Sequence, residues 1–203
     1  MDGIESERES IWVAISKDLA TDLNIDSVIT NNPDKIMDAN SIVFPGVGSF
    51  GDCMKELDRR KLIKPITDSI KSGKFFLGIC LGLQILFSKS EESPEVPGLG
   101  IFDGSIDKIN FDKKLKIPHM GWNKIFIEKK SEFLQGINNE SWMYFVHSFK
   151  FKIDQTLTLT KSEYGQEFSS SINKENIFAT QFHPEKSSSI GLKVLDNFSK
   201  LSN

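Results

Sequence analysis

The chain has 203 residues, with 25 lysines and arginines against 28 aspartates and glutamates, and a formal net charge of -3. This length suits one well-buried domain covering residues 1–203, and the absence of a basic surplus argues against nucleic acid as a partner. No stretch is long and apolar enough to span a membrane, and the polar first ten residues lack the apolar region of a signal peptide. We therefore expect a cytoplasmic protein that does not contact membranes.

The cysteines and histidines argue against disulfides and metal. Cys53 and Cys80 are the two cysteines, and a cytoplasmic setting keeps such thiols reduced. His119, His147 and His183 are widely spaced and contain no close pair of the kind that zinc sites show. We expect neither a metal nor a cofactor.

The first elements predicted along the chain are short. Apolar residues recur every four positions over residues 11–23 and predict an amphipathic helix, although residues 11–15 also fit a strand. Short strands are predicted at residues 27–30 and 41–44. The second of these strands leads into a glycine loop and then a helix, which together form half of an α/β unit.

The glycine loop at residues 46–51 has the pattern Gly-x-Gly-x-x-Gly, formally a dinucleotide-binding fingerprint. That fingerprint requires an acidic residue at the end of a second strand about 20 residues further on. The acid at that distance, Asp68, falls in a helical segment at residues 62–71. A P-loop is excluded because Asp52 and Cys53 stand where lysine and serine or threonine are needed. The loop is instead suited to bind a developing negative charge with its backbone N–H groups.

Cys80 follows a short apolar run at residues 75–79 that is typical of a strand buried on both faces. Gly78 and Gly82 flank it with the spacing of a nucleophile elbow, in which backbones approach closely. The residues after Cys80, through Phe87, predict an apolar helix whose first N–H groups stabilise a thiolate and bind an oxyanion. Taken alone, this segment fits an inert buried cysteine and a catalytic one equally well.

From residue 98 onwards the sequence pattern changes. Short strands separated by polar turns predict an antiparallel extension of a parallel sheet, followed by a helix at about residues 190–201. The strands are predicted at residues 100–103, 105–110, 124–128, 142–147, 149–153, 157–161 and 168–172.

His183 and Glu185 follow a strand that is predicted to begin near residue 177. Residues i and i+2 of an extended chain project to the same side, and Pro184 restricts the backbone between them. A nucleophile needs a base within reach, and the base needs an acceptor that fixes its tautomer. His-Pro-Glu alone fits an ordinary turn, but with the cysteine elbow and the glycine loop it predicts a triad of Cys80, His183 and Glu185.

Five motifs together resemble the class I glutamine amidotransferases and, within that class, the glutaminase subunits of imidazole glycerol phosphate synthases. The resemblance covers roughly residues 25 to 200 and implies a three-layer α/β sandwich with a central, mostly parallel sheet and an antiparallel extension. The motifs are Pro45-Gly-Val-Gly48, Gly78-Ile-Cys-Leu-Gly-Leu-Gln84, Ile117-Pro-His-Met-Gly-Trp-Asn123, Tyr144-Phe-Val-His-Ser148 and Gln181-Phe-His-Pro-Glu-Lys-Ser187.

The resemblance implies hydrolysis of L-glutamine to glutamate and ammonia. In a heterodimer, the ammonia would pass to a (β/α)8-barrel cyclase subunit that forms imidazole glycerol phosphate in histidine biosynthesis. Cys80 would form a glutamyl thioester, His183 would act as base and then acid, and Glu185 would orient His183. By position, the backbone N–H of Leu81 and one from Gly46, Val47 or Gly48 would form the oxyanion hole. Glutamine would be bound by Gln84, His147, Ser148 and Phe149. Trp122 and Lys186 would contact the cyclase.

Some of these roles depend wholly on the resemblance. Without it, Trp122 fits a core position and Lys186 an ordinary surface charge. The family also begins with an apolar strand and an Asp-Tyr-Gly-x-Gly-Asn type loop, and residues 2–10 here are polar and contain neither. Residues 11–15 could take over the strand, and we hypothesise that the fold survives with weaker coupling to the cyclase.

Two other functions remain open at this point. The same glutaminase chemistry could supply ammonia for nucleotide-sugar amidation in surface polysaccharide synthesis. Alternatively, the chain could be a non-catalytic regulatory or binding subunit that keeps the triad while its altered N-terminus prevents turnover.

Overall fold

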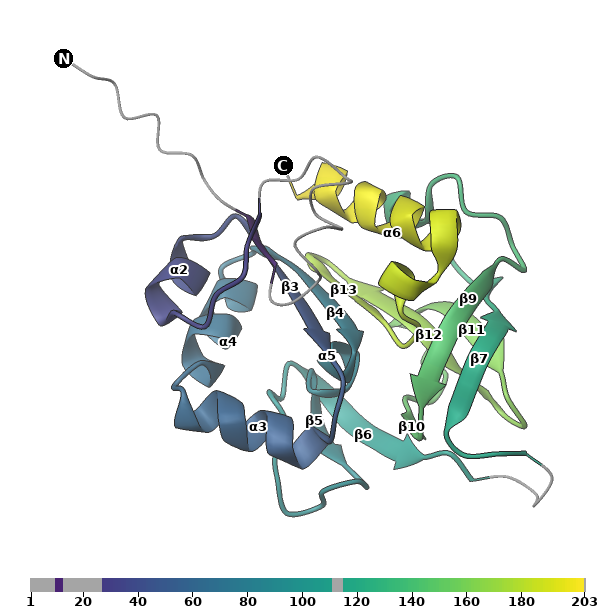
Figure 1. Ribbon diagram of the computed structural model, residues 1–203, viewed down its shortest axis with the longest axis horizontal. Coiled ribbons are helices and arrows are strands. Elements are labelled where there is room, and N and C mark those ends of the chain that lie inside the picture. The colour runs from purple at the N-terminus through teal and green to yellow at the C-terminus, as the bar shows by residue number, and fades with distance from the viewer. Residues whose placement is uncertain (1–9, 13–26, 111–114, 203) are drawn as a thin grey trace.

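An eight-stranded sheet runs through the molecule (Figure 1), in a computed structural model that describes residues 10–12, 27–110 and 115–202. Its strands, in spatial order, are β2 (Ser27–Val28), β1 (Ser10–Trp12), β3 (Ser41–Gly46), β4 (Phe75–Cys80), β13 (Ile177–Thr180), β12 (Glu167–Lys174), β11 (Thr158–Glu163) and β8 (Phe126–Ile127).

The sheet has a parallel half and an antiparallel half. Strands β2, β1, β3, β4 and β13 run parallel to one another, whereas β12, β11 and β8 add to β13 in antiparallel order. The central strands are buried on both sides, as their continuous apolar sequences predict. The mostly parallel sheet with an antiparallel extension is therefore confirmed.

Helices cover both faces of this sheet (Figure 1): α2 (Pro33–Asp38), α3 (Phe50–Arg59) and α4 (Ile63–Lys71) lie on one face, and α6 (Ser188–Leu201) lies on the other. Successive side chains of β3 point to the two faces of the sheet alternately. Ile42 and Phe44 pack in the core beneath α2, α3 and α4, while Val43 packs in the core beneath α6. The molecule thus has three layers, as expected.

Two smaller sheets lie beside the main one. The first has the order β10 (Phe149–Lys150), β6 (Phe102–Lys108), β5 (Phe87–Ser90), and the second pairs β7 (His119–Lys124) with β9 (Trp142–His147). Short 3-10 helices occur at η1 (Glu132–Leu134) and η2 (Pro184–Lys186).

Phe178 fixes α6 against the main sheet. Its ring centroid lies 4.9 Å from that of Phe133, 6.1 Å from Phe198 and 6.2 Å from Phe75. Aromatic pairs at these separations add to the apolar area that they bury. Because β13 carries Phe178 and also leads into the loop of His183, this packing helps to position the candidate catalytic residues.

The structure corrects the helix predicted at residues 11–23. Ile11 and Trp12 belong to β1, which pairs with both β2 and β3, so the alternative of a strand is correct at this point. Residues 13–26 lie outside the described part of the chain. The edge of the sheet that the polar N-terminus put in doubt is therefore present.

The helix predicted after Cys80 is also shorter than expected. Helix α5 covers only Leu81–Gln84, and the chain continues into strand β5. The backbone N–H groups of Leu99 and Ile101 donate to the carbonyl oxygens of Ile85 and Leu86. This pairing with a distant segment ends the helix, and local apolar periodicity does not reveal it.

Other elements differ in smaller ways. Strand β7 begins at His119, five residues before the strand predicted at residues 124–128, and the two strands predicted within residues 100–110 merge into β6. Helix α2 was not predicted, although Asn32 caps it by accepting a hydrogen bond from the N–H of Asp34 at 2.8 Å. Within the described residues, none of the helices has the length and apolar character needed to cross a membrane.

Candidate active site

Cys80 stands at a strained turn between β4 and α5. Its backbone adopts φ 53° and ψ -101°, a conformation that costs a non-glycine residue on the order of 1–3 kcal/mol. A Cβ on Gly78 would lie 2.4 Å from the carbonyl oxygen of Gly82, and one on Gly82 would lie 2.0 Å from that of Phe44. Both glycines are therefore required, and the predicted elbow is confirmed.

The short helix changes the electrostatics expected at the sulfur. With only four residues, α5 provides little of the macrodipole that a longer helix would direct at Cys80. A positively charged His183 therefore becomes the main group that stabilises a thiolate at this position.

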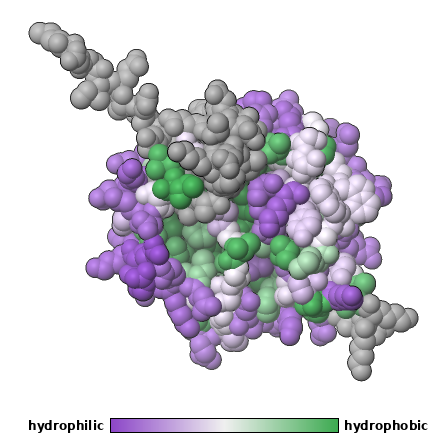
Figure 2. All heavy atoms as spheres, in the orientation of Figure 1, coloured by the Kyte–Doolittle hydropathy of each residue, from purple (hydrophilic) through white to green (hydrophobic). Residues whose placement is uncertain are grey.

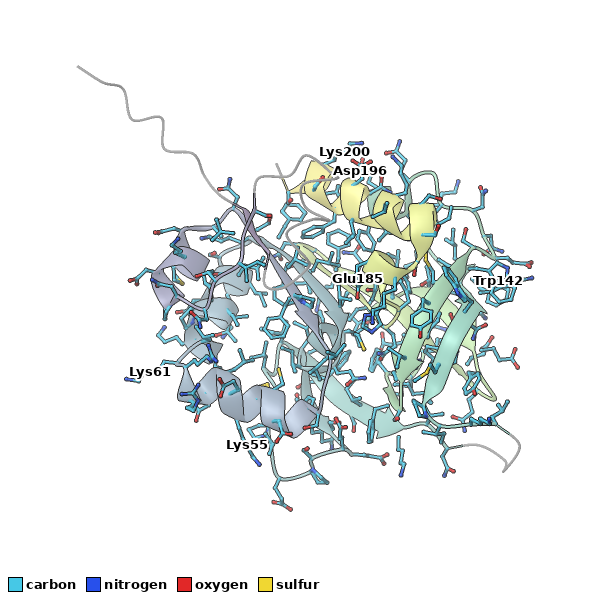
Figure 3. The ribbon with its side chains drawn as sticks, in the orientation of Figure 1. Lys55, Lys61, Trp142, Glu185, Asp196 and Lys200 are labelled. Atoms are coloured by element: carbon cyan, nitrogen blue, oxygen red, sulfur yellow. The ribbon has the colours of Figure 1, made fainter. Side chains whose placement is uncertain are left out.

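His183 and Glu185 meet across a tight turn. The Nδ1 atom of His183 lies 2.6 Å from Oε1 of Glu185. The extended chain predicted here is wrong, because Pro184–Lys186 forms the 3-10 helix η2, which brings the two side chains together instead. In Figure 3, Glu185 is labelled next to the first turn of α6, and its side chain is 22% exposed.

Backbone contacts hold the His183 loop against β9. The N–H of His183 donates to the carbonyl of Tyr144 at 2.9 Å. The hydroxyl of Ser187 accepts from the N–H of Tyr144 at 2.9 Å and donates to the carbonyl of His183 at 2.7 Å. The imidazole thus stands on a rigid support, which a general base requires.

The charge on His183 follows from its neighbours. Burial lowers the pKa of His183, but the Cys80 thiolate and the Glu185 carboxylate outweigh burial and raise the pKa from 6.5 to about 9. The side chain is 1% exposed, and its Nε2 atom has no hydrogen-bond partner among the described residues. At neutral pH His183 therefore favours the imidazolium form, with Nε2 available for proton transfer.

Two further groups contact the sulfur of Cys80. The carbonyl of Val146 lies 3.7 Å from the sulfur and accepts from it when Cys80 is a neutral thiol, and the side-chain amide of Gln181 donates to the sulfur at 3.6 Å. Gln181 is held by Nε2 of Gln84, which donates to Gln181 Oε1 at 3.3 Å and to the carbonyl of Phe149 at 3.2 Å. We did not predict Gln181 as a site residue, although it stands two residues before His183 at the end of a strand.

A cavity of about 260 Å³ opens beside Cys80 and is close in size to small ligand sites. It brings together most of the residues proposed for the oxyanion hole and for glutamine. Gly46 is outside the lining but pairs with Cys80 in the β3–β4 register. The predicted residues that line the cavity with Cys80 are Val47, Gly48, Leu81, Gln84, His147, Ser148 and Phe149, and residues not predicted are Glu92, Pro118 and Val146.

The second cysteine lies in a different place. Cys53 lines a larger cavity of about 400 Å³ bounded by α3, and burial raises the pKa of its thiol to about 11. Figure 2 shows hydrophobic residues in a hollow on this side of the molecule, rimmed by hydrophilic residues. No histidine is among the described residues that line this cavity, so Cys53 lacks the imidazole partner that Cys80 has and serves as an internal comparison.

The residues expected at a partner interface lie on the surface. Trp122 is part of β7 and 51% exposed, so it is not a core residue, and Lys186 is exposed at the end of η2. The ring of Trp122 contacts Tyr144 edge-on, with centroids 6.1 Å apart. Among the described residues, no three histidine, cysteine, aspartate or glutamate side chains cluster in a way that could hold a metal ion.

Comparisons with known proteins agree with this geometry. Residues 11–201 match the family model for the class-I glutamine amidotransferase. An "imidazole glycerol phosphate synthase subunit HisH" of Methanocaldococcus jannaschii is 48% identical over 86% of this chain and 87% of the relative. Subunits of the same name from Aquifex aeolicus and Pyrococcus furiosus are each 47% identical over 85% of this chain, covering 83% and 88% of their own lengths.

Solved structures support the fold. A crystal structure of a glutamine amidotransferase superimposes with a TM-score of 0.73 over 96% of this chain and 98% of its own, at 14% identity. The PurLQS structure from Thermotoga maritima gives 0.72 over 97% of this chain and 100% of its own, at 20% identity.

A cysteine elbow on a mostly parallel sheet, with histidine and glutamate supplied by the loop after a neighbouring strand, defines a class I glutamine amidotransferase, and the chain belongs to that class. Within the class, it belongs to the family of imidazole glycerol phosphate synthase HisH subunits.

The raised pKa of His183 predicts how stability depends on pH. The folded state holds this proton more tightly than the unfolded chain does, so the stabilisation is complete below pH 6.5 and is lost as pH rises through about 9. Glu185→Gln removes one of the groups that raise this pKa. We expect the variant to lose less stability between pH 6.5 and 9 than the wild type, as measured by denaturant unfolding. Parallel pH profiles for the two proteins would contradict the assignment.

Proposed function

We propose that the chain hydrolyses L-glutamine at Cys80 and delivers the ammonia to a (β/α)8-barrel cyclase subunit in a heterodimer, for histidine biosynthesis. The observation that carries the proposal is that His183 interacts with both Cys80 and Glu185, and that Cys80 lines a cavity of about 260 Å³.

The reaction begins with the thiolate of Cys80. It attacks the carboxamide carbon of glutamine, and the carbonyl oxygen becomes an oxyanion. The backbone N–H of Leu81 and one from residues 46–48 stabilise this charge. When the tetrahedral intermediate collapses, His183 gives the proton from Nε2 to the leaving nitrogen, which departs as ammonia and leaves a glutamyl thioester on Cys80.

Hydrolysis of the thioester uses the same groups in reverse. His183 takes a proton from a water molecule, which attacks the thioester carbon, and a second oxyanion forms in the same hole. Collapse breaks the carbon–sulfur bond, releases glutamate and returns the thiolate of Cys80 beside protonated His183. Throughout, Glu185 keeps Nδ1 of His183 protonated, so that Nε2 carries out the proton transfers.

Glutamine binding is proposed for Gln84 and residues 147–149. All of them line the cavity with Cys80, and the polar groups among them suit the amino and carboxylate groups of an amino acid. Gln84 donates to the Phe149 carbonyl, which ties the two walls of the cavity together.

A cyclase interface is proposed for the exposed face of β7 and for Lys186. Met120 and Trp122 are large apolar side chains that are exposed on this face of β7. Lys186 is also exposed and follows His183 by three residues in the sequence. Exposed aromatic residues of this kind act as anchors in protein interfaces. The names of the curated relatives, all subunits of one synthase, support a partner of this type.

The other two functions considered from the sequence receive less support. The relatives carry the name of the histidine-pathway synthase, and no observation favours nucleotide-sugar amidation. A non-catalytic subunit would have no need for an imidazole whose pKa is raised by a nearby thiolate and carboxylate.

A pair of cysteine variants tests the nucleophile. We expect Cys80→Ala to lower glutamate release, measured with a cyclase subunit and its ribotide substrate present, by at least about 10³-fold because no thioester can form. Cys53→Ala is the matched control and should retain activity within about threefold. Undiminished hydrolysis by Cys80→Ala would overturn the triad, whereas an absence of turnover by the wild type would favour the non-catalytic subunit.

A pair of tryptophan variants tests the interface. Trp122 and Trp142 are 51% and 53% exposed, and Trp142 lies at the outer end of β9 (Figure 3), where Lys124 Nζ is 5.7 Å from the ring centroid. We expect Trp122→Ala to weaken cyclase binding about tenfold by calorimetric titration, and Trp142→Ala to weaken it less than about threefold. Equal effects of the two changes would contradict the placement of the interface.

A further inference from the structure

Two buried histidines form a direct hydrogen bond beside the cavity. His119 on β7 and His147 on β9 are cross-strand partners and are 2% and 5% exposed. Nδ1 of His119 lies 2.9 Å from Nε2 of His147. Only His147 lines the cavity with Cys80, so His119 stands behind it.

The groups at the two ends of this pair determine where the protons lie. Nδ1 of His147 lies 2.8 Å from the carbonyl oxygen of Phe149, which can only accept, so this nitrogen carries a proton. At the other end, Asn123 accepts from the N–H of Lys124 through Oδ1 and donates from Nδ2 to the carbonyl of Glu163, both at 2.8 Å. The second Nδ2 proton of Asn123 points to His119 Nε2, 3.3 Å away.

One arrangement of neutral rings satisfies every contact. Asn123 donates to Nε2 of His119, Nδ1 of His119 donates to Nε2 of His147, and Nδ1 of His147 donates to the carbonyl of Phe149. Burial lowers the pKa of His119 to about 4 and that of His147 to about 3, so both rings are neutral at pH 7. If either ring gained a proton, two N–H donors would face each other at one of these hydrogen bonds, and that bond would be lost.

The ring of His119 is also fixed by packing. It stacks on Tyr164, with centroids 4.0 Å apart and planes 19° apart, and on Phe145, with centroids 4.9 Å apart and planes 23° apart. Tilting the ring of His119 out of this plane would break both stacks. Packing therefore holds the plane of the ring, and the hydrogen bonds of its two nitrogens set the direction in which it donates.

The chain of hydrogen bonds continues to the nucleophile. The carbonyl of Phe149 accepts from His147 and also from Nε2 of Gln84. Gln84 donates in turn to Gln181, whose amide donates to the sulfur of Cys80. Contacts of 2.8 to 3.6 Å thus connect strand β7 with the catalytic cysteine.

We propose that His119 is a positioning residue for glutamine binding, because its Nδ1–H holds His147, and through it residues 147–149, in place as a wall of the cavity. This inference rests on the proposed glutamine site. His119 lies outside the cavity lining and acts only through His147. A fully satisfied buried polar chain specifies one arrangement of its members, which apolar packing at the same place does not require.

The proton positions can be measured in the unmodified protein. Nitrogen chemical shifts of ¹⁵N-histidine-labelled protein at pH 7 distinguish the two neutral tautomers and the charged ring. We expect His119 and His147 both to be neutral with the proton on Nδ1. A proton on Nε2 of His147, or a charged ring at either position, would overturn the proposal without any variant having to fold.

Two variants at one position separate donation from packing. His119→Leu fills similar space without a donor, whereas the side-chain amide of His119→Asn can place an N–H near the position of Nδ1. We expect the leucine variant to raise the KM for glutamine about tenfold while kcat changes less than about threefold, and the asparagine variant to restore most of the loss. A folded leucine variant with wild-type KM would overturn the proposal, as would an asparagine variant no better than leucine.

The outcome for Cys80→Ala distinguishes failure of this inference from failure of the proposed function. If Cys80→Ala still hydrolyses glutamine, the glutamine site itself is wrongly placed, and the role proposed for His119 is wrong as well. If Cys80→Ala is inactive while the KM of the leucine variant equals that of the wild type, the site stands and only the positioning role is wrong. Thermal unfolding of each variant shows whether it is folded under the assay conditions.

Discussion

The close approach of three backbone segments at Cys80 is the constraint on which the rest of the site depends. The backbone at Gly78 packs against the carbonyl of Gly82, and the backbone at Gly82 packs against the carbonyl of Phe44, so neither position has room for a side chain. These backbone contacts hold Cys80 at φ 53°. The strain is compatible with folding because β3, β4 and β13 are adjacent and largely buried strands of the sheet, which hold the turn in place. The same strand order brings the loop of His183 to the sulfur and the glycine loop of β3 to its other side.

Electrostatic interactions then set the chemistry. The four residues of α5 give little dipole, so the charge that favours a thiolate comes mainly from His183, held at 2.6 Å by Glu185. The two thiols of the chain illustrate the difference. Burial alone raises the pKa of Cys53 to about 11, whereas Cys80 has a cation within the same buried site. The polar contacts of Gln181 and Val146 further fix the sulfur in one place.

Features that depend on neighbouring residues could be predicted from the sequence, whereas features that depend on pairing between distant segments could not. The elbow was predictable because Gly78, Cys80 and Gly82 meet within one turn, and His183 with Glu185 because they are two residues apart. The length of α5 was not, because its end depends on a segment near residue 100. The bond between His119 and His147 was missed for the same reason, since it requires the register of β7 against β9. The roles proposed for the cavity residues came from family motifs rather than from periodicity.

The most direct measurement is to trap the covalent intermediate. The wild-type protein, mixed with a cyclase subunit, its ribotide substrate and glutamine, is quenched in acid during turnover, digested and mapped by mass spectrometry. The account predicts a glutamyl adduct on the peptide that contains Cys80 and none on the peptide that contains Cys53. Glutamate release with both peptides unmodified, or an adduct on Cys53, would contradict the claim that Cys80 is the nucleophile.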